Sequence, residues 1–224
     1  MIEYIFLIVY FLVAAADLFA CIKENRKLEY FAKPLLMPIL AIYFILGTYT
    51  FGTDWLIVLA LVFGFLGDVF LMLENEEKWF MFGTAAFLIG HIFYIISFLI
   101  SVGANLLAFP LWGILLILPA ILILFLTFPK FKDHMGELRI PVYVYIAVIL
   151  LMHFSAILRL AAFDLLCPCF ILVWIGSMLF ILSDSMIAVD TFNDDIEISH
   201  FYTMLTYIVG QFLITQGILM SILL

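Results

Sequence analysis

Residues 55–73 read WLIVLALVFGFLGDVFLML. This apolar run has about the length that a helix needs to cross the hydrocarbon core of a bilayer. Its one ionisable side chain is Asp68, which hydrocarbon cannot solvate, so this carboxyl is expected to have either a function or a polar partner. Gly64 and Gly67 share a helix face with Asp68, and a neighbouring helix can approach closely there. A second aspartate, Asp184, lies between two serines in another apolar run.

The composition is that of an integral membrane protein. Hydrophobic residues make up 68% of the 224 residues, charged residues 12%, and the mean hydropathy is +1.31. A soluble domain of this length does not need so much apolar surface. Long unbroken apolar runs favour helices over the alternating strands of a membrane barrel. The formal charge of −8 gives no indication of a nucleic-acid partner.

The hydropathy pattern predicts an all-α polytopic membrane protein with eight transmembrane helices in a single domain, 1–224. The first run carries Glu3 where a cleavable signal peptide has basic residues, so we expect it to remain as a span. The acidic turns at 74–77 and 194–197 are expected to be solvated surface. The predicted spans are 3–22, 32–50, 55–73, 79–100, 108–128, 140–160, 168–189 and 200–222.

Basic residues predict the orientation of these spans. Of the 9 lysines and arginines, only Arg159 lies beside an even-numbered turn, and the others lie in or beside odd-numbered turns. Because basic residues are enriched in cytosolic loops, the odd-numbered turns are predicted to face the cytosol and both termini the outside. We expect a multi-pass protein of a bacterial inner membrane, with an oligomeric state that the sequence leaves open.

Three aspartates are predicted to lie at one depth on three different helices. Asp17, Asp68 and Asp184 each lie six residues before the first residue of the cytosolic turn that follows their span, which is about 9 Å at the rise of an α-helix. Carboxylates at one level can converge on one cavity. Two carboxylates that meet in a low-dielectric site cannot both ionise cheaply, so such a pair shares a proton and can act as acid and base. The alternative is that each aspartate bonds a serine, tyrosine or lysine in a helix interface.

Further polar side chains are candidates for lining such a cavity. His91 and Tyr94 share a helix face with Phe87, and Tyr207 and Gln211 repeat this pattern on the last span. Each of them is equally explained as a hydrogen-bonded residue of the helix core.

The remaining polar positions have simpler interpretations. Lys33 opens the second span at the cytosolic rim, where it is either an interfacial lysine or a ligand for an anionic headgroup that also pairs with Asp17. His153 is expected to be structural. Cys167 and Cys169 form a possible redox or metal pair, but packing or chance is favoured because no other soft ligand clusters near them.

A repeated spacing suggests an internal repeat. Asp68 and Asp184 occupy the third and seventh spans, and each is followed 23 residues later by a ring, His91 or Tyr207. This spacing suggests two four-helix halves related by a parallel repeat. The remainder of the two halves shows little identity, so the repeat stays open.

Four motifs follow one another in a recognisable order: KPLLMP at 33–38, GDVFLM at 67–72, G-x3-F-x3-H-x2-Y at 83–94 and F-x2-S-D at 180–184. Together they resemble the YhhN-like lysoplasmalogenase family. The resemblance implies a membrane hydrolase that cleaves the vinyl ether bond of lysoplasmalogens drawn from the bilayer. Its products would be a fatty aldehyde and glycerophosphocholine or glycerophosphoethanolamine. The resemblance also implies that Asp68 and Asp184 are the catalytic pair and that no metal or cofactor takes part.

Other functions remain possible for the same residues. A vinyl ether is hydrolysed by protonation of carbon and capture of the oxocarbenium ion by water, which a carboxyl–carboxylate pair could promote. A proton-coupled transporter or channel would use the same intramembrane carboxylates as a proton relay. A non-catalytic membrane scaffold would leave these carboxylates without a purpose. Aldehyde release by the purified protein distinguishes the enzyme from the other two.

The orientation can be tested by labelling. Residues 23–30 and 129–139 are predicted to face the cytosol, so the variant Lys132→Cys in a cysteine-free background should react with a membrane-impermeant maleimide only after intact cells are permeabilised. The variant Asn105→Cys, in an even-numbered turn, should react without permeabilisation. Labelling of position 132 from outside would contradict the orientation.

Overall fold

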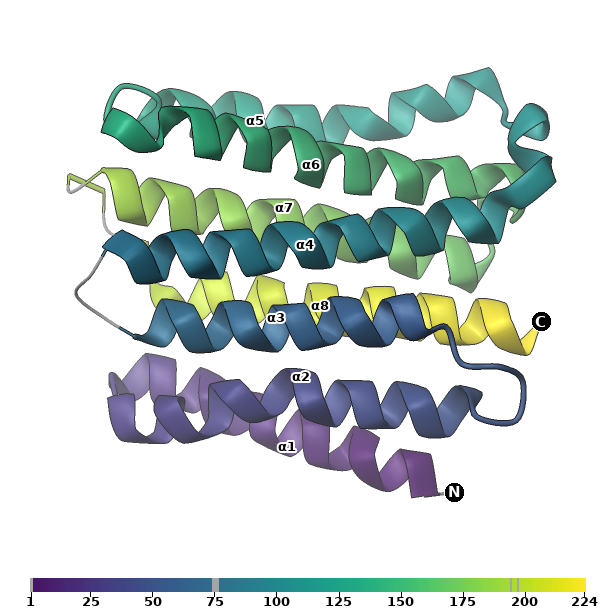
Figure 1. Ribbon diagram of the computed structural model, residues 1–224, viewed down its shortest axis with the longest axis horizontal. Coiled ribbons are helices and arrows are strands. Elements are labelled where there is room, and N and C mark those ends of the chain that lie inside the picture. The colour runs from purple at the N-terminus through teal and green to yellow at the C-terminus, as the bar shows by residue number, and fades with distance from the viewer. Residues whose placement is uncertain (1, 74–76, 194, 197) are drawn as a thin grey trace. The chain divides into compact units, whose positions relative to one another are not determined.

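The computed structural model describes residues 2–73, 77–193, 195–196 and 198–224. Within these residues, eight helical segments are long and apolar enough to cross a membrane, which confirms the prediction of an all-α protein with eight long apolar helices. Residues 74–76, 194 and 197 of the two acidic turns lie outside the described residues. The long helices are α1 (Ile2–Lys23), α2 (Arg26–Thr48), α3 (Trp55–Met72), α4 (Glu77–Val102), α5 (Leu118–Phe131), α6 (Arg139–Leu158), α7 (Pro168–Phe192) and α8 (His200–Leu223) (Figure 1).

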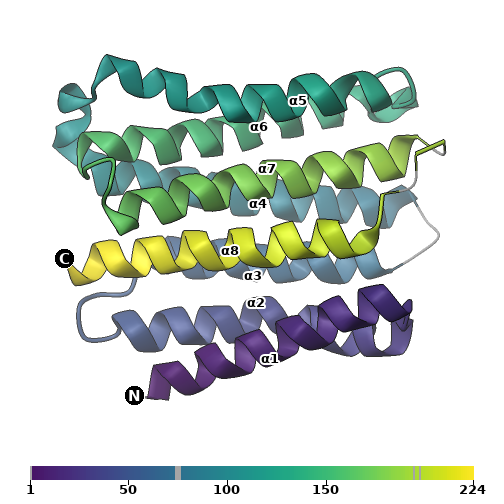
Figure 2. The same cartoon turned by 180° about the vertical axis from the view of Figure 1, so that it is seen from behind.

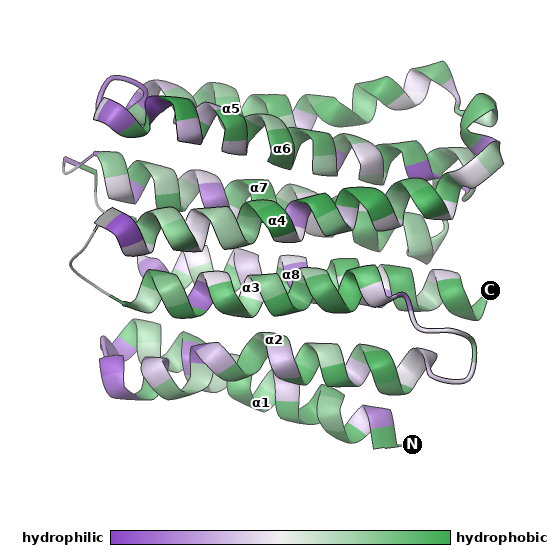
Figure 3. Cartoon of the chain, in the orientation of Figure 1, coloured by the Kyte–Doolittle hydropathy of each residue, from purple (hydrophilic) through white to green (hydrophobic). Residues whose placement is uncertain are grey.

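Hydrophobic residues cover these helices along their length, and hydrophilic residues concentrate near helix ends (Figure 3). Many outward-facing side chains are large and apolar, among them Leu12, Phe31 and Phe125. A surface of this kind is not stable in water, whereas hydrocarbon solvates it well. The protein is therefore expected to be multi-pass in a membrane.

The chain forms two compact units. The first unit is Met1–Ser97 with Ile218–Leu224, and the second unit is Phe98–Gly217. In the first unit, α1 packs on α2, and α2 packs on α3. In the second unit, α7 packs against both α5 and α6, and its other neighbour is α8 (Figure 2).

The second helix begins earlier than the sequence predicted, at Arg26 instead of residue 32. The chain reverses at Glu24, whose φ is 51°. Asn25 then caps α2, because its side chain accepts a hydrogen bond from the backbone N–H of Leu28 at 3.2 Å. The charged residues after Asn25 indicated a turn, but arginine, lysine and glutamate are good helix formers once a cap is present. Lys33 consequently lies two turns inside α2 and does not open it.

The fifth span also differs from the prediction, because only its second part is α-helical. Two 3-10 helices, η1 (Gly103–Ala108) and η2 (Leu111–Ile117), precede α5. The indole N–H of Trp174 donates to the carbonyl of Leu116 at 3.2 Å. This bond gives a donor to a backbone carbonyl of a less regular segment, which would otherwise be exposed to lipid without a hydrogen bond.

The side-chain contacts between α6 and α7 in the second unit include two polar ones. The Nδ1 atom of the buried His153 lies 2.8 Å from Ser177 Oγ. This contact is of the structural kind that the sequence suggested for His153. The other contact involves Asp184 and belongs to the candidate site.

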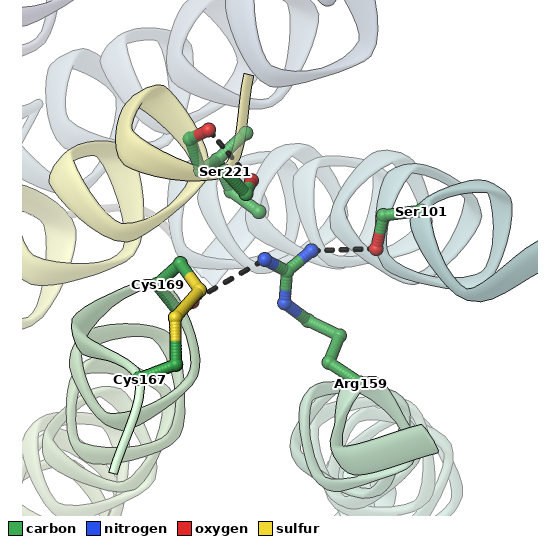
Figure 4. The surroundings of a disulfide bond; sticks show 6 residues. Ser101, Arg159, Cys167, Cys169 and Ser221 are labelled. Atoms are coloured by element: carbon green, nitrogen blue, oxygen red, sulfur yellow. Dashed lines mark hydrogen bonds between the residues drawn. A yellow bond between two sulfur atoms is a disulfide. The ribbon is translucent and has the colours of Figure 1, made fainter. Parts of the chain in front are cut away.

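Cys167 and Cys169 form a disulfide where α7 begins, with their Cα atoms 5.3 Å apart (Figure 4). The interpretation of this pair as packing or chance is therefore wrong. Residues two apart in a helix point away from each other, but Cys167 has extended backbone angles, φ −65° and ψ 125°, and Pro168 is the first helical residue. Because disulfides form outside the cytosol, the bond favours the extracytosolic side predicted for this turn.

Glycines allow α7 and α8 to approach backbone to backbone. A Cβ atom added to Gly176 would lie 2.7 Å from the carbonyl oxygen of Gly210, and one added to Gly210 would lie 3.0 Å from that of Gly176. The first distance is shorter than any real Cβ contact, and a backbone carbonyl cannot rotate away. The two helices can therefore keep this separation only with glycine at position 176.

This contact predicts an effect on stability. Gly176→Ala should lower the free energy of unfolding by about 1–3 kcal/mol, because the helices must separate. Gly47→Ala is the matched control, since its added Cβ would meet only the end of the Leu219 side chain, which can rotate. Denaturation of the purified protein in mixed detergent micelles measures both. Equal stabilities of the two variants would contradict the assignment.

Candidate functional site

Asp68 lies beside a close contact between α3 and α4. The preceding residue, Gly67, faces the ring of Phe87, and a Cβ atom on Gly67 would lie 2.6 Å from this ring. The ring therefore lies against the backbone of α3 at Gly67, and Asp68 beside it is only 2% exposed. The predicted close approach of a neighbouring helix beside Asp68 is thus present within the first unit.

Tyr10 lies near Asp68 in the first unit, and Tyr94 lies near Tyr10. Tyr10 of α1 is fully buried and lies within electrostatic range of both Asp68 and Tyr94 of α4. Tyr94 is a predicted site residue, whereas Tyr10 was missed. The signal for Tyr10 was available in α1, where the buried residues are Tyr10, Ala14, Asp17 and Ala20, a stripe at helical spacing.

His91 shares the buried face of α4, as the spacing predicted. It is 1% exposed, Tyr94 is 1% exposed and Phe87 is 7% exposed. The residue before it, Gly90, lies against the backbone of α3, with an added Cβ 3.2 Å from the carbonyl oxygen of Ala60. This contact fixes the rotation of α4 and directs the His91 face into the first unit.

Asp17 and Lys33 come to the same end of the α1–α2 pair. Both are buried, with exposed fractions of 0% and 7%. The charges of Asp17, Glu29 and Lys33 all act on the thiol of Cys21 in α1. Of the two interpretations of Lys33, a lysine extended into interfacial water fits this burial less well than one that faces other charged groups.

Asp184 has a partner in the second unit that the sequence did not reveal. The hydroxyl of Tyr145 in α6 donates a hydrogen bond to Asp184 Oδ2. Asp184 is half-buried, and Ser183 beside it donates to the carbonyl of Thr203 in α8 at 3.1 Å. Nothing in the spacing of α6 distinguishes Tyr145 from its neighbour Tyr143, so only the packing of α6 on α7 identifies this partner.

Tyr207 and Gln211 lie buried on α8 within the second unit. The ring of Tyr207 meets Phe180 of α7 edge to face, with 5.6 Å between the ring centres. Phe180 is one turn before Asp184, so Tyr207 packs next to the helix face that carries this carboxylate. Tyr207 therefore belongs to the α7–α8 contact, and Gln211 is buried one turn further along α8.

The crossing of α3 and α4 recurs between α7 and α8. A Cβ atom added to Gly90 would have as its nearest neighbours the carbonyl oxygen, the Cβ atom and the backbone nitrogen of three α3 residues. A Cβ atom added to Gly210 would meet the same three kinds of atom in α7. The two sets of residues, 60, 63 and 64 in α3 and 176, 179 and 180 in α7, have the same spacing.

Both aspartates occupy the same position relative to their crossing. Asp68 and Asp184 each lie eight residues, about two helical turns, after the first contacted residue. Gly90 of α4 and Gly210 of α8 are therefore at equivalent positions in the two crossings, and so are the residues that follow them, His91 and Gln211. The spacing of 23 residues paired His91 with Tyr207, and the crossing corrects this register by one turn.

These residues provide carboxylates, phenols, an imidazole and an ammonium group inside membrane helices. Such groups can donate and accept protons or bind a charged headgroup. Among the described residues, no three His, Cys, Asp or Glu side chains are grouped so that they could hold a metal ion.

Residues 28–218 match the YhhN family. No match to a curated protein or to a solved structure was found. The matched range contains all four motifs that carried the resemblance, together with Asp68 and Asp184, whereas Tyr10 and Asp17 precede it. The chain belongs to the YhhN family.

Proposed function

We propose that this protein is a lysoplasmalogenase, which hydrolyses the vinyl ether bond of lysoplasmalogens within the membrane. The observation that carries the proposal is the setting of Asp68 in a chain of the YhhN family. This carboxyl is 2% exposed inside a membrane helix and lies within electrostatic range of the buried Tyr10. Burying an ionisable group there is costly and is expected where the group has a chemical role.

The reaction needs an acid and a base in a site with little water. Protonation of the β-carbon of the vinyl ether produces an oxocarbenium ion, and water that loses its proton to a base adds to the adjacent carbon. The resulting hemiacetal separates into a fatty aldehyde and the glycerophospho-alcohol. Protonation of carbon is slow unless the acid is well positioned, and a carboxylate nearby stabilises the positive charge that develops.

The two aspartates differ in ways that suit these two roles. Asp184 accepts a hydrogen bond from the Tyr145 hydroxyl, and a donated hydrogen bond favours a carboxylate over a neutral carboxyl group. Asp68 is more deeply buried than Asp184. In our proposal Asp184 is therefore the base that activates water, and Asp68 is the acid that protonates carbon.

The α1–α2 pair suits the headgroup of such a substrate. Lys33 would bind the phosphate, and Asp17, at the same end of the pair, would face the ammonium or choline group. His91, Tyr207 and Gln211 would line the remainder of the site. The alkenyl chain of a lysophospholipid can remain in lipid while its headgroup reaches these charges.

The central prediction concerns the two carboxyl groups. Asp68→Asn and Asp184→Asn should each lower aldehyde release from a vinyl-ether lysophospholipid by roughly 10³-fold or more, because an amide keeps the shape of the carboxyl group but cannot exchange its proton. If the two groups act as a unit, the double variant should be little slower than either single variant. The measurement is single-substrate kinetics of detergent-purified protein.

Asp54→Asn is the matched control for this experiment. Asp54 caps α3 by accepting from the backbone N–H of Leu56 at 2.9 Å, and it also accepts from Ser97 Oγ at 2.6 Å. Asparagine is as good a helix cap as aspartate, so this variant should keep its turnover. If Asp68→Asn and Asp184→Asn both keep more than about a tenth of the wild-type turnover, the hydrolase proposal fails and proton-coupled transport becomes the better explanation.

A second prediction tests the Tyr145 hydroxyl as a positioning group for Asp184. Tyr145→Phe should lower kcat by roughly 10- to 100-fold with little change in KM, because a hydrogen bond to a charged group contributes about 1.5–3 kcal/mol. Tyr143→Phe is the control, since the Tyr143 ring packs near Phe128 with 6.0 Å between the centres and the substitution keeps the ring. Equal kcat values for the two variants would remove Tyr145 from the mechanism.

A further inference from the structure

The disulfide at the start of α7 has two unequal sulfur atoms. Cys167 is partly exposed, whereas Cys169 is fully buried at 0% exposure. A thiolate must approach a disulfide along the axis of the sulfur–sulfur bond, so only the Cys167 sulfur can be attacked from outside the protein. The sulfur that would leave is then that of Cys169.

A buried cation contacts the backbone of Cys169, the residue that carries the leaving sulfur. Arg159 of η4 (Arg159–Ala161) is 0% exposed and donates through Nη2 to the carbonyl oxygen of Cys169 at 3.3 Å. Its Nη1 donates to Ser101 Oγ, and its guanidinium carbon lies 4.7 Å from the centre of the Phe163 ring. Figure 4 shows the guanidinium group directed at Cys169, between the end of α6 and the start of α7.

The disulfide is poorly suited to a purely stabilising role. It joins residues only two positions apart in the sequence. A cross-link stabilises a protein chiefly by restricting its unfolded chain, and the effect grows with the length of the closed loop. A loop this short restricts the unfolded chain very little, so the arrangement of Arg159 beside it requires another explanation.

We propose that Cys167–Cys169 is a thiol–disulfide exchange site, in which Arg159 stabilises the departing Cys169 thiolate. Cys169 is in the first turn of α7, where the helix dipole also favours negative charge. Thiol–disulfide exchange is faster when the thiolate that leaves is stabilised. The ligand of this site is the thiolate of an extracytosolic thiol, and the inference does not rest on the lysoplasmalogenase proposal.

The exchange proceeds in two balanced steps. A thiolate attacks Cys167 Sγ, so that a mixed disulfide forms, the Cys167–Cys169 bond breaks, and Cys169 leaves as a thiolate beside Arg159. A second thiolate then attacks the sulfur of the bound thiol, which releases Cys167 as a thiolate. Two external thiols are oxidised to one disulfide, and the protein takes up the two electrons as a dithiol.

The first experiment measures which sulfur reacts. In a Cys21→Ser background, the variant Cys169→Ser keeps only Cys167, and the variant Cys167→Ser keeps only Cys169. Oxidised glutathione should form a mixed disulfide with the Cys169→Ser variant at least about tenfold faster, because only Cys167 is accessible, and intact-protein mass spectrometry counts the adducts. Equal rates, or a faster reaction of the Cys167→Ser variant, would overturn the proposal.

The second experiment measures the effect of the guanidinium charge. With reduced glutathione in excess, alkylation of the freed thiols follows the opening of the disulfide in detergent-purified protein. Arg159→Gln should slow this opening by roughly tenfold, because the leaving thiolate loses its cation. Ser101→Ala is the control, since it removes one hydrogen bond of the guanidinium group and keeps its charge, and its rate should stay within about threefold of wild type.

Two outcomes of the second experiment would overturn the proposal. One is a wild-type disulfide that glutathione does not open, which is the behaviour of a structural disulfide. The other is an Arg159→Gln variant that opens as fast as wild type. If Arg159→Gln does not elute as folded protein in size-exclusion chromatography, the wild-type opening and the comparison of Cys167 with Cys169 decide the question.

Discussion

The position of both candidate catalytic aspartates depends on helix backbones that touch at glycine. In lipid, two helices gain little from hiding apolar side chains, because hydrocarbon surrounds them equally well when they are apart. Close backbone contact is therefore a main source of attraction, and Gly90 against α3 and Gly210 against α7 provide it. Asp68 and Asp184 each lie about two turns beyond such a contact. A wider separation of the helices would open both carboxyl groups to lipid.

The same crossing is used with different polar side chains in the two units. At the position after the crossing glycine, α4 carries His91 and α8 carries Gln211. An imidazole is an ionisable group, whereas the side-chain amide of glutamine is not. The aspartates also differ, since Tyr145 donates to Asp184, whereas Asp68 is deeply buried near Tyr10. The same crossing thus carries unlike side chains in the two units, and the function proposed above gives the two aspartates unlike roles.

A buried polar group also lies at the predicted extracytosolic end of the helices. Arg159 is the only basic residue near an even-numbered turn, and it is fully buried. Its guanidinium group donates hydrogen bonds to Ser101 and to the carbonyl oxygen of Cys169 and lies near the rings of Phe98 and Phe163, with 5.8 and 4.7 Å to the ring centres. A buried positive charge favours negative charge on the groups next to it, and the neighbour of Arg159 is the Cys167–Cys169 disulfide.

The sequence by itself determined the eight spans, the family and the buried face of α4, because length, hydropathy and the three-residue spacing of His91 and Tyr94 are properties of a single helix. Only the tertiary structure decided which side chains from different helices meet. Tyr145 as the partner of Asp184 and the one-turn register of α8 depend on how one helix is rotated and shifted against another. Hydropathy alone does not predict how one apolar helix is rotated against the next. Backbone contact at a few glycines fixes this rotation.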